Sequence, residues 1–122
     1  MANILIIEDD EALAKTLALA LPGHRVRLAA TGGDGLDQAT SQRPDLIVLD
    51  ILLPDMSGIE VLTELKADDK TSALPVIVLT NLNNAATVEK ILAAGGKDFF
   101  VKTDWRIDEL AEKIENSLTS LV

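Results

Sequence analysis

A run of apolar residues that ends in an acid decides the fold, and residues 45–58 contain it: DLIVLDILLPDMSG. Residues 46–49 are aliphatic and too few for a helix, which predicts a strand buried on both faces. Asp50 follows this run directly. Further on, Ser57 and Glu60 have the spacing of a capping box, which predicts the start of a helix. The segment therefore predicts a buried strand, a loop and a helix.

Three further apolar runs predict strands of the same buried kind: residues 4–7, 74–79 and 99–101. Residues 24–30 alternate instead, which is typical of a half-exposed edge strand. Helical patterns lie between the strands. The helices are expected over residues 13–21, from residue 34 to before Pro44, from Ser57, over about 84–94 and from near Asp104. This alternation predicts an α/β fold with a five-stranded parallel sheet, helices on both faces and one domain over residues 1–122.

Composition limits the chemistry. The 122 residues contain no cysteine and one histidine, which excludes thiol nucleophiles, disulfides and thiolate metal sites. The charge is −9, and the few basic residues are scattered, which argues against nucleic acid or an acidic membrane as a partner. No apolar run approaches the roughly 18 residues of a membrane span, so we expect a cytoplasmic protein.

Polar residues follow four of the predicted strands. In open α/β sheets, ligands bind beyond the carboxyl ends of the strands, so these residues are the candidates for a site. They are Glu8, Asp9 and Asp10 after the first run, Asp50, Thr80 and Lys102. Each also has a simpler interpretation: Asp9 or Asp10 as a helix cap, Asp50 as the cap of a turn, Thr80 as an ordinary strand residue and Lys102 as a surface lysine.

The coincidence of these residues at one end of the sheet favours a site. Glu8, Asp9 and Asp50 would repel one another unless they took up a proton or bound a cation, and oxygen ligands select a hard ion such as Mg²⁺. A lysine and a hydroxyl group beside such an ion are suited to stabilising a phosphoryl group in transfer. The residues alone therefore predict a metal-assisted phosphoryl site.

The same motifs resemble the receiver domain of response regulators, along the whole chain. The resemblance rests on the acidic end of residues 4–10, on residues 45–58, on Thr80, and on residues 95–102, which lead to a lysine. It implies the flavodoxin-like strand order 2-1-3-4-5, Asp50 as phosphoacceptor, and Thr80 and Lys102 as its partners. It also implies a Mg²⁺ site, with Mn²⁺ as a substitute, at Asp9, Asp50 and the Leu52 carbonyl, with Glu8 acting through water, and a switch at Thr80 and Phe99.

The resemblance further implies a function in two-component signalling. Asp50 would take a phosphoryl group from a sensor histidine kinase or a histidine phosphotransfer protein and pass the signal to a downstream protein target. Such a domain is a substrate that assists its own phosphorylation and dephosphorylation, not an enzyme. We expect a stand-alone receiver that is a monomer or a weak phosphorylation-dependent dimer.

Two features depart from the family pattern. Thr103 replaces the proline that usually follows the lysine, which predicts a trans peptide or one held by strain, and leaves Asp104 to cap the last helix. Leu52 and Leu82 put apolar side chains two residues after Asp50 and Thr80, where neither can position a water. We therefore expect slow self-dephosphorylation.

Several alternatives remain. The most serious is a receiver that is no longer phosphorylated and acts as a protein-binding module. A flavodoxin-like cofactor binder would need a loop rich in Ser, Thr and Gly after the first strand, where this chain has acids. A P-loop nucleotidase is excluded by the missing motif. An aspartyl phosphatase would have a second aspartate where Leu52 stands.

Overall fold

Five parallel strands form one sheet in the order β2-β1-β3-β4-β5, which confirms the predicted fold and strand order. The computed structural model describes residues 2–81, 84–96 and 98–119. The strands are β1 Asn3–Ile7, β2 Arg25–Ala29, β3 Leu46–Asp50, β4 Val76–Thr80 and β5 Asp98–Val101. They cover the predicted runs to within a few residues, because β-branched and aliphatic side chains suit strands buried between helices.

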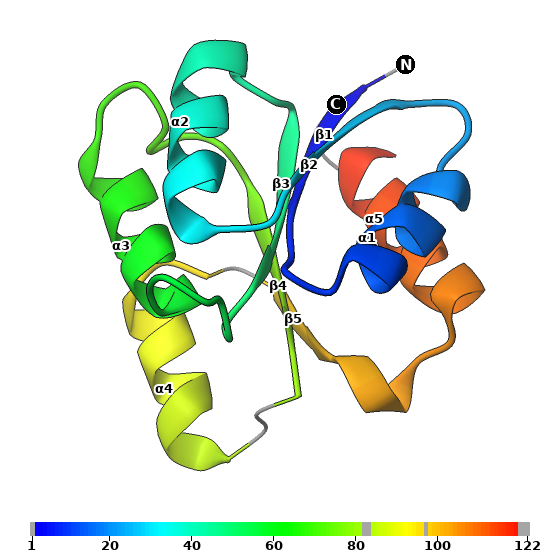
Figure 1. Cartoon of the computed structure of the whole chain (residues 1–122). Coiled ribbons are helices and arrows are strands. Elements are labelled where there is room, and N and C mark those ends of the chain that lie inside the picture. The colour runs from blue at the N-terminus through cyan, green and yellow to red at the C-terminus, as the bar shows by residue number, and fades with distance from the viewer. Residues whose placement is uncertain (1, 82–83, 97, 120–122) are drawn as a thin grey trace.

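Helices cover both faces of the sheet (Figure 1). They are α1 Glu11–Leu19, α2 Gly32–Gln42, α3 Gly58–Ala67, α4 Ala85–Ala93 and α5 Ile107–Thr119, with a short 3₁₀ turn at Lys102–Asp104. On one side of the sheet lie α2, α3 and α4, and on the other lie α1 and α5 (Figure 1). No helix among the described residues is both long enough and apolar enough to cross a membrane.

Each face of the sheet has its own apolar core. Leu5 and Ile7 of β1 pack toward α2, α3 and α4, whereas Ile4 and Ile6 pack toward α1 and α5. The same alternation continues through β3 and β4, whose residues are all buried. Because successive side chains of a strand point to opposite faces, a sheet covered on both sides needs continuous apolar runs. These two cores fix the strands whose carboxyl ends carry the polar residues.

Two details differ from the sequence prediction. The run at residues 99–101 was expected to be buried on both faces, but β5 is an edge strand and these residues are half-buried. The last helix was expected to begin near Asp104 with that residue as its cap. Asp104 instead ends the 3₁₀ turn, and α5 begins at Ile107, where Glu109 accepts a hydrogen bond from the backbone N–H of Arg106 at 2.9 Å.

Candidate functional site

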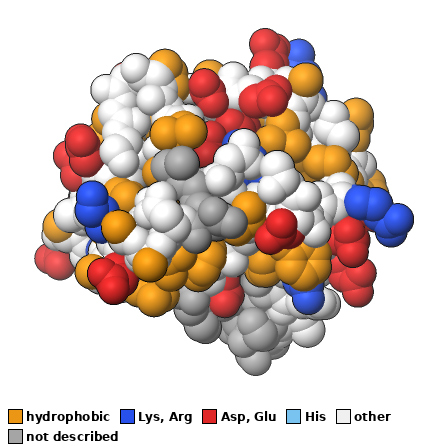
Figure 2. All heavy atoms as spheres, turned by 90° about the horizontal axis from the view of Figure 1, so that it is seen from below, with side chains coloured by type: hydrophobic (Ala, Val, Ile, Leu, Met, Phe, Trp, Pro, Cys, Tyr) orange, Lys and Arg blue, Asp and Glu red, His pale blue; other side chains and the backbone are white. Residues whose placement is uncertain are grey.

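Four strands deliver polar side chains to one end of the sheet. Glu8 directly follows β1, Asp50 ends β3, Thr80 ends β4, and Lys102 directly follows β5. Because Ile7 of β1 pairs with Leu49 of β3, Glu8 and Asp50 come side by side. Figure 2 views this end of the molecule and shows acidic side chains gathered there, with hydrophobic side chains around them. The predicted convergence is therefore present.

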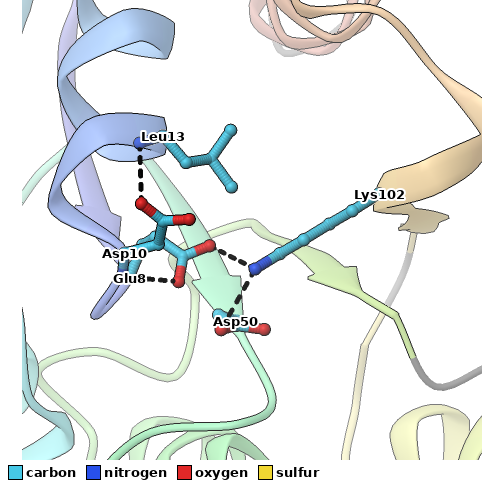
Figure 3. Close-up of polar contacts among 5 residues, drawn as sticks. All are labelled: Glu8, Asp10, Leu13, Asp50 and Lys102. Carbon is cyan, nitrogen blue, oxygen red and sulfur yellow. Dashed lines mark hydrogen bonds and ion pairs between the residues drawn. The ribbon is translucent and has the colours of Figure 1, made fainter.

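The ammonium group of Lys102 lies between the two buried carboxylates (Figure 3). It forms an ion pair with Glu8 Oε1 and lies 3.2 Å from Asp50 Oδ2. The side chains of Glu8 and Asp50 are only 4% and 5% exposed, and that of Lys102 is 14% exposed. Buried charges are tolerated when they are paired, so the lysine and the two acids stabilise one another here.

This arrangement perturbs the protonation of two groups. Burial raises the pKa of Glu8 to about 7, the bond from Lys102 opposes this, and the neighbouring Asp50 adds to it. Burial disfavours the charge of Lys102, but the bond to Glu8 and the charge of Asp50 raise its pKa above the ordinary value. The lysine therefore stays cationic, and Glu8 is the carboxylate that takes up a proton near neutral pH.

The adjacent acids Asp9 and Asp10 have different roles. Asp10 caps α1, since its carboxylate accepts a hydrogen bond from the backbone N–H of Leu13 at 3.1 Å (Figure 3). Asp9 is exposed, and one of its oxygens lies within 4.8 Å of oxygens from Glu8 and Asp50. Among the described residues this is the one acidic cluster with the spacing of a metal site. The helix-cap interpretation therefore holds for Asp10 and leaves Asp9 available.

The donor set fits a hard divalent cation. Two buried carboxylates form the floor of the cluster, and the exposed Asp9 stands at its rim. Mg²⁺ typically uses one or two carboxylates and keeps room for water and phosphate oxygens. Lys102 supplies positive charge to Glu8 and Asp50, the two buried acids of this set.

The loop after β3 turns back against the end of its strand. Leu52 forms an isolated antiparallel bridge with Ser57, and Gly58 donates a hydrogen bond to the Ile51 carbonyl at 2.7 Å. A Cβ atom at position 58 would come within 2.6 Å of the Ile51 Cα, so only glycine permits this approach. The backbone of Leu52 is thereby held beside Asp50, and its side chain is 57% exposed.

Sequence reasoning missed the residue that anchors this loop. The carboxylate of Asp55 accepts hydrogen bonds from the backbone N–H groups of Gly32 and Gly33, at 2.8 and 2.9 Å. These two bonds lower the pKa of Asp55. Orphan N–H groups at the start of α2 attract such a carboxylate, but the partner is more than twenty residues away, so no local pattern indicates it.

Thr80 and Phe99 lie on the same face of the sheet. Thr80 is fully buried and pairs with Val101, the residue before Lys102. Phe99 pairs with Val78 and packs, half-buried, against the core beneath α3 and α4. A movement of Thr80 would therefore change the packing along the β4–β5 pair, which includes Phe99.

The segment after Lys102 is held by aromatic contacts. The ring of Trp105 meets Phe100 edge to face at 5.7 Å, and the ammonium group of Lys113 lies 5.2 Å from the Trp105 ring. The expected trans peptide after Lys102 is confirmed, since no described peptide bond is cis. Leu82, expected to flank the site, lies outside the described residues.

The comparisons with known proteins agree with this geometry. Residues 4–115 match the response regulator receiver domain family. The chain is 45% identical over 104 residues to the transcriptional regulatory protein AfsQ1 of Streptomyces coelicolor, covering 84% of this chain and 45% of AfsQ1. It spans about half the length of several of the curated relatives it matches.

Solved structures agree as well. A CheY-like response regulator receiver domain protein from Methanospirillum hungatei superposes with a TM-score of 0.89 at 30% identity, covering 98% of this chain and 95% of that one. The phosphorylated cyanobacterial phytochrome response regulator RcpA superposes with a TM-score of 0.87 at 27% identity, covering 99% and 96%.

The chain belongs to the response regulator receiver domain family. It is therefore a phosphoacceptor domain of two-component signalling, and the family is not a class of conventional enzymes. The alternative of an unphosphorylated binding module is not favoured.

Proposed function

We propose that Asp50 is the phosphoacceptor, and that it receives its phosphoryl group from a phosphohistidine on a sensor histidine kinase or a histidine phosphotransfer protein. The observation that carries this proposal is the pairing of Lys102 with both Asp50 and Glu8 in a buried site. A buried carboxylate beside a lysine ammonium group is suited to forming an acyl phosphate, because the ammonium group can pair with the added negative charge.

The proposed step uses Asp50, Lys102 and Thr80 at this end of the sheet, together with the phosphohistidine of the donor. A carboxylate oxygen of Asp50 attacks phosphorus, the P–N bond of the phosphohistidine breaks, and its electron pair returns to the imidazole. Lys102 then pairs with a phosphoryl oxygen in place of Glu8, and the Thr80 hydroxyl donates to another. Both interactions hold the new negative charge in a site that is largely shielded from water.

The metal ligands follow from the same cluster. We assign Asp9, Asp50 and the Leu52 carbonyl to a bound Mg²⁺, for which Mn²⁺ can substitute, with Glu8 acting through water. When bound, the ion neutralises charge on the phosphoryl oxygens and on the attacking carboxylate. Glu8 and Asp50 are the buried acids of this set, and Asp9 is its exposed member.

Phosphorylation would change the surface that the domain presents to other proteins. Engagement of Thr80 by the phosphoryl group would draw that residue toward Asp50, and Phe99 would move into the space on the same face. The surface of α4, β5 and α5 would then present a different shape to a downstream protein target. Phosphoryl transfer from a kinase also predicts a cytoplasmic location. We further propose that the chain is a monomer or a weak phosphorylation-dependent dimer.

A labelling experiment tests the proposal. The chain is incubated with Mg²⁺ and acetyl phosphate, and its intact mass is measured. We expect the added mass of one phosphoryl group, absent in Asp50→Asn and retained in Asp69→Asn, which makes the same change at an exposed aspartate after α3. No labelling of the native chain, or labelling of Asp50→Asn, would overturn the assignment and favour the binding module.

A further inference from the structure

The edge strand β2 presents backbone groups that have no partner strand. The backbone N–H of Arg25 donates to the Ala2 carbonyl, and the backbone N–H of Glu8 donates to the Ala29 carbonyl, each at 2.9 Å. In a parallel ladder the two backbone groups of successive residues face opposite sides, so those of Val26 and Leu28 face outward. Gln38 Nε2 donates to the Leu28 carbonyl at 3.0 Å. The other outward groups are the Val26 N–H, the Val26 carbonyl and the Leu28 N–H. None of them forms a hydrogen bond with a described residue beyond the β1–β2 ladder.

One face of this edge is cationic. Arg25 and Arg27, exposed side chains two residues apart, line a cavity of about 220 Å³ with Gln38 and Gln42 beneath α2. Neither guanidinium forms an ion pair with a described carboxylate, although the whole chain carries a charge of −9. Two unpaired guanidinium groups at strand spacing suit carboxylates at the same spacing.

The opposite face of the same edge is apolar. Val26 and Leu28 are half-buried and line a groove of about 480 Å³, with Leu19, Leu21 and Pro22 on the side of α1. Leu19 is 81% exposed, more than any other large hydrophobic residue described. An exposed apolar groove beside free backbone groups is typical of a surface that accepts another chain.

We propose that the β2 edge binds an extended segment of a partner protein, which adds to the sheet as a sixth strand. Side chains of a strand alternate between faces, so the segment that fits alternates acidic residues, toward Arg25 and Arg27, with apolar residues, toward the Leu19 groove. Outward backbone groups supply hydrogen bonds, and side chains on the two faces supply specificity. The edge lies between α1 and α2, at the opposite side of the sheet from β5 (Figure 1). Binding of the segment at this edge therefore does not require phosphorylation of Asp50.

A second copy of this chain fits the edge poorly. Antiparallel pairing of two β2 strands about a two-fold axis would put the arginines of both copies on one face, where like charges repel. Charged residues on an edge strand also discourage unwanted pairing in general. The test therefore separates a strand-accepting edge from a merely protected one.

The probe is a short synthetic peptide that alternates valine and glutamate. Amide chemical shifts of the ¹⁵N-labelled chain are followed as the peptide is added. We expect saturable changes centred on residues 25–28, and no such changes with a peptide of the same composition whose glutamates are grouped together. A peptide methylated at alternate backbone nitrogens is expected not to bind. No saturable change, or equal binding of the grouped or methylated peptide, would overturn the proposal.

Variants of the chain supply the second arm. Arg25→Glu combined with Arg27→Glu is expected to weaken binding about tenfold, because two attractive ion pairs become repulsive. Lys70→Glu combined with Lys90→Glu makes the same charge change at exposed positions elsewhere and is expected to leave binding unchanged. Asp50→Asn is also expected to bind the peptide normally, so this result is distinguishable from failure of the phosphoacceptor assignment. Equal loss in both double variants, or dimerisation of the native chain through β2, would contradict the proposal.

Discussion

The loops after β1 and β5 supply the two halves of the site, and they are held in different ways. The loop after β1 is short, and Asp10 ends it at once by capping α1. The loop after β5 passes through a 3₁₀ turn that lacks a side-chain cap, and α5 begins five residues after Lys102. Lys102 is instead held by Glu8 and Asp50, which are distant in sequence.

The difference indicates which half responds to a signal. The acidic half is held by hydrogen bonds between near neighbours in sequence, from the Leu13 N–H to Asp10 and from the Asp10 N–H to Glu8. The cationic half is fixed by the ion pairs of Lys102 with Glu8 and Asp50, the acids to which we assign the phosphoryl group and the metal site. We therefore expect a new charge at Asp50 to redistribute the contacts of Lys102 first and those of the β5–α5 segment second.

The largest expected effect comes from removing the cationic half. Lys102→Met keeps the length of the side chain but leaves Glu8 and Asp50 buried without a counter-ion. Without metal, we expect the free energy of unfolding to fall by about 2 to 3 kcal/mol, as a denaturant titration would measure. Mg²⁺ should restore more stability to this variant than to the native chain. Equal stability of the two chains without metal would contradict the role of the ion pair.

A matched pair of substitutions separates the two neighbouring acids. Asp9→Asn removes a proposed metal ligand and is expected to weaken Mg²⁺ binding on the order of tenfold or more. Asp10→Asn removes the same charge one residue away but keeps a good helix cap, so Mg²⁺ affinity should change little. Isothermal titration calorimetry measures both. Equal losses would mean that general charge, and not ligation by Asp9, attracts the ion.

The raised pKa of Glu8 predicts a dependence on pH. Its value of about 7 in the fold lies above the ordinary 4.5, so its contribution to stability is complete below 4.5 and is lost as the pH rises through 7. We expect the metal-free chain to lose stability across this window, as denaturant titrations at several pH values would measure, whereas Glu8→Gln should lose less. Mg²⁺ affinity should rise over the same window, because the ion competes with the proton. A flat native profile would contradict this protonation.

The smallest effect concerns the lifetime of the acyl phosphate. Leu52 is 57% exposed two residues beyond Asp50 and has no polar group with which to orient water. Leu52→Asn is expected to shorten the lifetime several-fold, as measured by loss of the phosphoryl mass over time. Leu92→Asn, at a similarly exposed leucine of α4, should leave it unchanged. Loss of the phosphoryl group from the native chain within seconds would show that the Leu52 side chain does not protect the acyl phosphate from hydrolysis.

Sequence patterns predicted the parts that depend on nearest neighbours. Continuous apolar runs indicated the buried strands, and the acids after residues 7 and 49 indicated the site, because burial and strand ends are local properties. Ser57 was correctly expected to begin α3, although its hydroxyl accepts from Ile59, two residues on, and not from the third residue as a capping box would have it.

The remaining features depend on contacts between distant residues. The exposed edge of β5 follows from its place in the sheet, which its own sequence does not state. The segment before the late start of α5 is held by contacts of this kind, from Lys102 to Glu8 and from Trp105 to Phe100. Only the folded chain shows that Asp10 caps α1 while Asp9 joins the site, since both residues have the composition for either role.

The central claim is that the phosphoryl group resides on Asp50, and its location can be measured directly. Borohydride reduces an acyl phosphate of aspartate to homoserine, which changes the mass of one residue in a peptide digest. After reaction with acetyl phosphate and Mg²⁺, we predict homoserine at position 50 of the native chain. Homoserine at position 9, 10 or 55, or none at all in a chain that carries the phosphoryl mass, would contradict the account.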